Sequence, residues 1–126
     1  MANTIVWADI PVADMDRARK FYSAVLQADI QMMPGSDDVA LLPGDPMGGD
    51  VSGDLVKGEN STPGTGGITI YLDSAGDPEG MIERAVAAGG QVAMPVSDMG
   101  EMVGFIGFFI DSEGNRIGVH APAKRS

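Results

Sequence analysis

The chain repeats one structural plan, and this internal repeat is the feature that most constrains its fold. An apolar segment predicted as a strand (Thr4–Val12) precedes a segment with helical periodicity (Met15–Gln27). About 60 residues later a second apolar strand (Gly67–Leu72) precedes a second predicted helix (Pro78–Ala88). Short strands and glycine-rich turns follow each helix. The sequence therefore predicts an α+β fold of two βαβββ modules, which form a mixed sheet that encloses a cleft.

Local signals support both helices. Asp14 can cap the first helix and Asp77 the second, where Pro78 suits the first turn. Each helix carries one apolar stripe at helical spacing. The stripes are Ala18, Phe21, Tyr22, Val25 and Leu26 in the first helix, and Met81, Ile82, Ala85 and Val86 in the second.

The other strands are expected to be short and bounded by turns. They are Ile30–Met33, Val39–Leu42, Val51–Val56, Gln91–Met94, Phe105–Ile110 and Arg116–His120. The last two form a hairpin around Asp111–Asn115, which has turn composition. Pro95–Val103 is typical of a loop, and we expect it to cross the mouth of the cleft.

The length of 126 residues fits one domain, residues 1–126. Within it we expect modules at 1–58 and 67–126. Residues 59–66 have the composition of a linker and join them.

Composition excludes several functions. The net charge of −10 disfavours nucleic acid and anionic membranes as partners, because phosphate groups would be repelled. The absence of cysteine excludes disulfides, thiolate zinc sites and a cysteine nucleophile. No apolar run approaches the ~20 residues that span a bilayer, and no signal peptide is evident. We therefore expect a soluble, cytoplasmic protein.

Two stretches resemble the vicinal oxygen chelate superfamily, which includes glyoxalase I, bleomycin-resistance proteins and extradiol dioxygenases. Residues 7–22 resemble the opening of that fold, and residues 104–118 resemble its closing hairpin. The resemblance covers essentially the whole chain. It implies the fold, a cleft and a homodimer, but no single function, because this fold carries several chemistries and some purely binding proteins.

The resemblance also implies three positions at which enzymes of the superfamily hold a divalent metal. In this chain they are occupied by Trp7, Gly67 and Gly118, none of which can coordinate a metal through its side chain. The single histidine, His120, lies two residues beyond the last of these positions. We therefore expect no metal cofactor.

Four residues are candidates for ligand binding. Trp7 and Asp9 share one face of the first strand, where Trp7 could form a flat apolar wall. Tyr71 could orient a polar ligand through its hydroxyl group, and Arg116 could pair with Asp9. Each residue also has a purely structural interpretation. Trp7 would be a core residue, Tyr71 a packed residue at the rim, and Asp9 and Arg116 an ion pair.

His120 and Glu101 are the candidate catalytic residues. His120 is the side chain whose ordinary titration lies near neutral pH. Glu101 lies where the superfamily often closes its cleft. Structural or solvated roles remain open for both.

Three functions follow. The favoured one is a metal-free protein of the glyoxalase/bleomycin-resistance type that binds a small organic molecule in the cleft. The second is a metal-dependent lyase, isomerase or dioxygenase with a shifted site built from His120, Glu101 and Asp9. The third is a non-catalytic regulatory or interaction module that uses the acidic surface.

Overall fold

The βαβββ plan occurs twice in the computed structural model, which describes residues 4–123. The first module contains β1 (Trp7–Pro11), α1 (Met15–Leu26), β2 (Gln31–Met32), β3 (Val39–Leu41) and β4 (Ser52–Val56), with a short 3-10 turn at Pro46–Gly48. The second contains β5 (Tyr71–Asp73), α2 (Pro78–Ala87), β6 (Gln91–Asp98), β7 (Phe105–Ile110) and β8 (Arg116–Ala121). The predicted fold class is confirmed.

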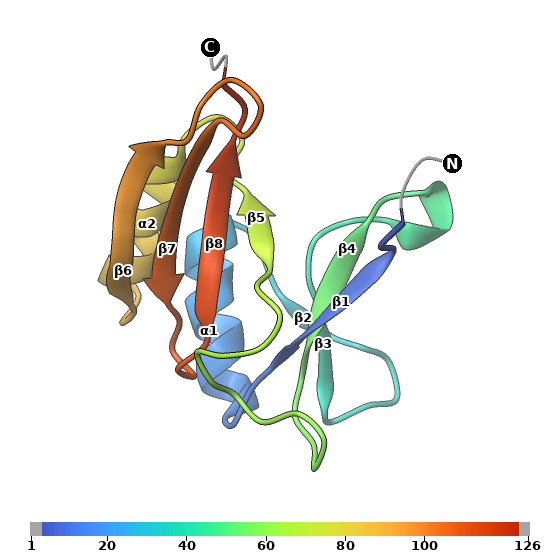
Figure 1. Cartoon of the computed structure of the whole chain (residues 1–126). Helices are drawn as coiled ribbons and strands as arrows, with labels where there is room; N and C mark the ends of the chain where they lie inside the picture. Colours follow the sequence, from blue (N-terminus) through green and yellow to red (C-terminus); the bar gives the residue numbers. More distant parts are fainter. Residues whose placement is uncertain (1–3, 124–126) are drawn as a thin grey trace.

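The strands form two four-stranded sheets, with the orders β1-β4-β3-β2 and β5-β8-β7-β6. Each sheet is mixed, because its first strand pairs in parallel with its last (β1 with β4, β5 with β8) and the other pairs are antiparallel. β1 and β5 are therefore edge strands. Figure 1 shows the two sheets side by side, with α2 on one face of the second sheet.

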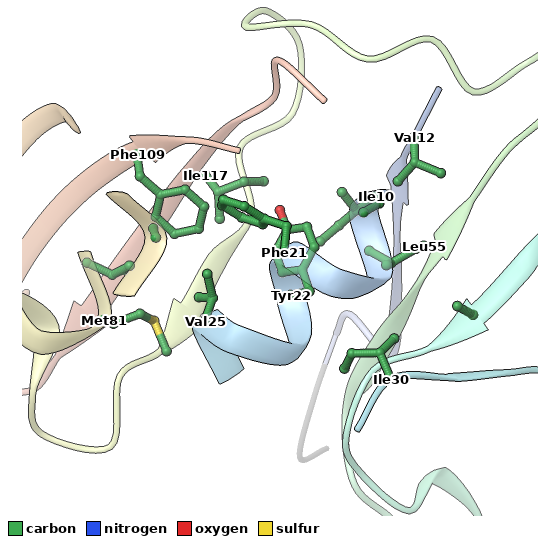
Figure 2. Close-up of a cluster of buried hydrophobic side chains, with 14 of the residues drawn as sticks. Ile10, Val12, Phe21, Tyr22, Val25, Ile30, Leu55, Met81, Phe109 and Ile117 are labelled. Carbon is green, nitrogen blue, oxygen red and sulfur yellow. The ribbon is translucent and has the colours of Figure 1, made fainter. Parts of the chain in front are cut away.

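Helix α1 belongs to the first module but packs against both. Asp14 caps it by accepting a hydrogen bond from the Arg17 N–H, and Gln27 ends it in the left-handed conformation. In Figure 2, Phe21, Tyr22 and Val25 lie between Phe109 of β7 and Leu55 of β4. One continuous hydrophobic core therefore spans both sheets.

The turn between β7 and β8 forms a buried polar joint between the modules. The Tyr22 hydroxyl donates to Asp111 Oδ2 at 2.6 Å, and Asn115 Nδ2 donates to the carbonyl of Pro11 at 2.7 Å. Asn115 Oδ1 accepts a hydrogen bond from the Gly64 N–H at 3.0 Å, which fastens the connecting segment. The predicted hairpin turn is confirmed, and three of its polar residues, Asp111, Glu113 and Asn115, are buried.

Glu113 is the most heavily bonded side chain of this turn. Its carboxylate accepts hydrogen bonds from the Ala13 and Asp14 N–H groups at 2.8 and 2.7 Å, and it pairs with Arg17 Nε at 2.7 Å. Burial acts to raise the pKa of Glu113, but hydrogen bonds from Arg17, the Asp14 N–H, Ser112 and the Ala13 N–H outweigh it and lower the pKa to about 2.

Two boundary predictions differ from the structure. β6 continues through Pro95 to Asp98, so the predicted loop over Pro95–Val103 was wrong for its first part. The strand tolerates proline because its pairing with β7 shifts register between Met94 and Ser97. The second-module strand predicted at Gly67–Leu72 forms later, at Tyr71–Asp73. Neither α-helix of the described chain is long and apolar enough to cross a membrane.

Candidate functional site

A pocket of about 1090 Å³ lies between the edge strands β1 and β5. One wall is formed by β1, and the opposite wall by β5 and the start of β8. The connecting segment contributes Thr62, Gly64 and Gly66, so both modules and the segment that joins them line the pocket. Most lining side chains are apolar, including Ile5, Trp7, Ile10, Leu26, Leu42, Val51, Ile68, Ile70, Leu72 and Ile117. A large apolar pocket with few polar groups is typical of a small-molecule site.

The four residues predicted to bind a ligand all line this pocket. Trp7 and Asp9 come from β1, while Tyr71 and Arg116 come from the opposite wall. Trp7 and Asp9 lie on the same face of β1, as the alternation of the strand predicted, because Ile10 points into the core.

Tyr71 fills the space that Gly118 leaves free. A Cβ atom at Gly118 would lie 2.6 Å from the Tyr71 ring, so a side chain at this position would displace the ring from where it lies. The ring also packs on Phe108, with their centroids 5.5 Å apart. Tyr71 is nevertheless 46% exposed, which leaves part of the ring open to the pocket.

Arg116 does not pair with Asp9, so that part of the prediction was wrong. Within residues 4–123 no ion pair joins them, and the Arg116 guanidinium lies 3.6 Å from the centroid of the Phe108 ring. This is the geometry of a cation–π contact. The Asp9 carboxylate is exposed at the pocket wall.

The two candidate catalytic residues lie outside the pocket lining. Nε2 of His120 is 2.6 Å from the carbonyl oxygen of Val103, to which a protonated ring nitrogen would donate. Glu101 is exposed in the turn that follows β6. Over the described residues, no set of three His, Cys, Asp or Glu side chains is arranged to hold a metal ion.

The residues at the three positions implied for metal ligands do not fit a metal either. Trp7 offers only an N–H donor, and Gly118 faces the Tyr71 ring. Gly67 has positive φ, and a Cβ atom at this position would have no neighbour within 4 Å, so it presents open space rather than a ligand. The structure thus does not join His120, Glu101 and Asp9 into the shifted site of the second hypothesis.

Asp54 on β4 lies next to the pocket-lining residue Asp9 and was not predicted from the sequence. It is the register partner of Asp9 in the parallel β1–β4 pair, and it is only 8% exposed. Its Oδ1 atom is buried and has no hydrogen-bond partner among the described residues. Burial first, and the adjacent Asp9 carboxyl second, raise the pKa of Asp54 to about 6, against a smaller opposing effect of hydrogen bonding to Trp7.

We expect Asp54→Asn to stabilise the protein at neutral pH. Because the folded-state pKa lies above the unfolded value of 3.8, the ionisation of Asp54 costs stability as pH rises from about 4 to 6, and the whole cost is present above pH 6. With solvent screening, the gain should be about 1–2 kcal/mol at pH 7. Urea unfolding at pH 7 and pH 4 measures it, and a gain that did not shrink at pH 4 would contradict the raised pKa.

Comparison with known proteins identifies the family and the structures that this chain resembles. Residues 4–119 match the family model described as Glyoxalase/Bleomycin resistance protein/Dioxygenase superfamily. No curated protein sequence matches the chain.

Solved structures share the fold at low sequence identity. A glyoxalase/bleomycin resistance protein from Albidiferax ferrireducens T118 is 18% identical with a TM-score of 0.67, covering 93% of this chain and 98% of the other. A hypothetical protein from S. aureus is 17% identical with a TM-score of 0.67, covering 96% and 98%. TnmS3, an antibiotic binding protein from Streptomyces sp. CB03234, is 22% identical with a TM-score of 0.62, covering 97% and 98%.

Proposed function

Because the chain belongs to the Glyoxalase/Bleomycin resistance protein/Dioxygenase superfamily, we propose that it binds a small organic molecule in the pocket between β1 and β5. We propose further that binding needs no metal ion. The observation that carries the proposal is the pairing of Trp7 and Tyr71 on opposite walls of one largely apolar pocket.

The contacts around Tyr71 support metal-free binding. Its ring takes the space at Gly118 that a ligating side chain would need, and so an aromatic surface stands where the resemblance implies a metal ligand. Aromatic walls bind planar or aliphatic groups by apolar contact and stacking. The antibiotic-binding description of TnmS3 supports the same class of function, since that protein shares the fold.

The contacts of His120 argue against the enzymatic alternative. Its Nε2 atom faces a backbone carbonyl, and neither His120 nor Glu101 lines the pocket. No described residue cluster favours a metal-dependent lyase, isomerase or dioxygenase over binding.

A homodimer remains our expectation. It is supported by the edge strands β2 and β6, which lie away from the pocket and carry no partner strand on their outer side within residues 4–123. Exposed apolar residues on or beside these strands are Met33 and Val92. Apolar side chains next to open strand edges are typical of surfaces that pair with another chain.

Fluorescence of Trp7 tests the binding proposal, because it is the single tryptophan of the chain. In a screen of small aromatic fragments of differing charge, we expect saturable changes in Trp7 emission that persist after dialysis against a chelator. Tyr71→Ala should weaken binding about tenfold, the equivalent of about 1.4 kcal/mol. Met102→Ala is the control, because Met102 is fully exposed and outside the pocket.

Three results would count against the proposal. One is the absence of any saturable response across the fragment set. Another is equal weakening by Tyr71→Ala and Met102→Ala. The third is binding that is lost on chelation and restored by a divalent ion.

A further inference from the structure

The buried carboxyl group of Asp54 is the least satisfied polar group of the described chain. Its Oδ1 atom has neither a solvent contact nor a hydrogen-bond partner there. Leaving such a group unpaired costs free energy that most buried polar groups avoid. A proton on Asp54 or a positive charge near it would offset this cost.

Asp54 interacts with Asp9 and Trp7 of the pocket wall, although Asp54 itself is not among the residues that line the pocket. Asp9 lies opposite it in the β1–β4 register, and Trp7 pairs with Ser52 two residues earlier on the same face. Trp7 and Asp9 both line the pocket. Two carboxyl groups and one indole ring are thus adjacent on two neighbouring strands.

The charges around the pocket leave this wall negative. The charged residues of the lining are Asp9, Asp73 and Arg116. Arg116 lies against the Phe108 ring on the opposite wall, and no ion pair in the described chain joins it to Asp9. Burial first, and the adjacent Asp9 carboxyl second, raise the pKa of Asp54, and among the described residues no ion pair offsets the negative charge of either carboxylate.

We propose that Trp7, Asp9 and Asp54 form a subsite for a cationic nitrogen, the amine, amidine or guanidinium group of a bound molecule. The exposed Asp9 carboxylate contacts the cation, and Asp54 adds a second negative charge beside it. The Trp7 ring offers a π face, the best aromatic partner for a cation. This inference rests on the proposed binding function and names the chemical class of its ligand.

Three probes of one shape test the inference: cationic benzamidine, neutral benzamide and anionic benzoate. Trp7 fluorescence at neutral pH gives the dissociation constant of each. We expect benzamidine to bind at least tenfold more tightly than benzamide, and benzoate to bind most weakly.

Charge-removing variants locate the effect. Asp9→Asn and Asp54→Asn should each weaken benzamidine binding about tenfold while leaving benzamide binding within twofold. Asp37→Asn is the matched control, because it makes the same charge change at an exposed position outside this pocket. Thermal melting of each variant verifies that it is folded.

The outcomes separate this inference from the binding proposal. If benzamide or benzoate binds as well as benzamidine, or if Asp37→Asn weakens benzamidine as much as Asp54→Asn, the cationic subsite is wrong although the pocket binds small molecules. If fragments of other charge bind and benzamidine does not, the subsite is also wrong. If no fragment of any charge perturbs Trp7, the binding proposal itself fails and the subsite with it.

Discussion

Replacing Glu113 by alanine is expected to lower the free energy of unfolding by about 3 kcal/mol, because the change removes a buried carboxylate together with several charge-assisted hydrogen bonds and its ion pair with the half-exposed Arg17. The side chain is fully buried at the junction of the β7–β8 turn and the start of α1. Its loss leaves the Ala13 and Asp14 N–H groups and the Arg17 guanidinium without their shared acceptor. Urea unfolding followed by circular dichroism measures the change.

Glu113 also predicts a dependence on acid. Its folded-state pKa of about 2 lies below the unfolded value of 4.5, so its stabilisation is complete above pH 4.5 and is lost as pH falls toward 2. The Ala variant should therefore converge on the parent protein in acid. Glu83→Ala removes an exposed glutamate of α2 and should change stability by less than about 0.5 kcal/mol. Equal effects of the two substitutions would contradict the role of the turn as a joint.

Replacing Phe21 by alanine is expected to cost about 3–5 kcal/mol, the usual range for a buried phenylalanine. Its ring centroid lies 5.0 Å from that of Tyr22 and 5.9 Å from that of Phe109 on β7, so it contacts both its own helix and the second module. A Cβ atom at Gly90 would lie 3.0 Å from Phe21 Cε1, which shows how closely the two modules approach. Denaturant unfolding should show one cooperative transition with a lower midpoint.

Two controls accompany the Phe21 substitution. Phe21→Leu keeps most of the volume and should cost less than about 1.5 kcal/mol. Val86→Ala removes an apolar side chain that is 44% exposed on α2 and should cost much less than Phe21→Ala. If Phe21→Ala cost under about 1 kcal/mol, α1 would not be the shared core element that the structure describes.

The internal repeat predicted the fold well because helix caps and apolar periodicity depend on residues that are close together in the sequence. Asp14 and Asp77 cap the two helices, and the apolar stripes face the core as their spacing indicated, except that Val86 is exposed. β6 was predicted too short because Pro95 ordinarily ends strands, and only the register shift between β6 and β7 permits it. That shift depends on the partner strand and cannot be read from one segment.

The lining of the pocket was predicted in part. Alternation along each strand identified Trp7, Asp9, Tyr71 and Arg116, which the structure places around one pocket. The prediction that Asp9 pairs with Arg116 was wrong because the sequence does not give the distance between their strands. In the structure the Arg116 guanidinium lies against the Phe108 ring.

Asp54 was missed although a signal for it exists. It is the one charged residue of the strand Ser52–Val56, and a carboxylate in a buried strand is costly unless it has a partner. That Asp54 lies next to Asp9 could be known only from the parallel register of β1 and β4, two strands that lie far apart in the sequence.

A crystal structure of the protein with its tightest-binding fragment tests the central claim most directly. The account predicts density for the fragment between Trp7 and Tyr71, on the wall that Asp9 shares, with no metal ion in contact with it. Fragment density outside this pocket, or a metal ion held by His120 and Glu101, would contradict the account.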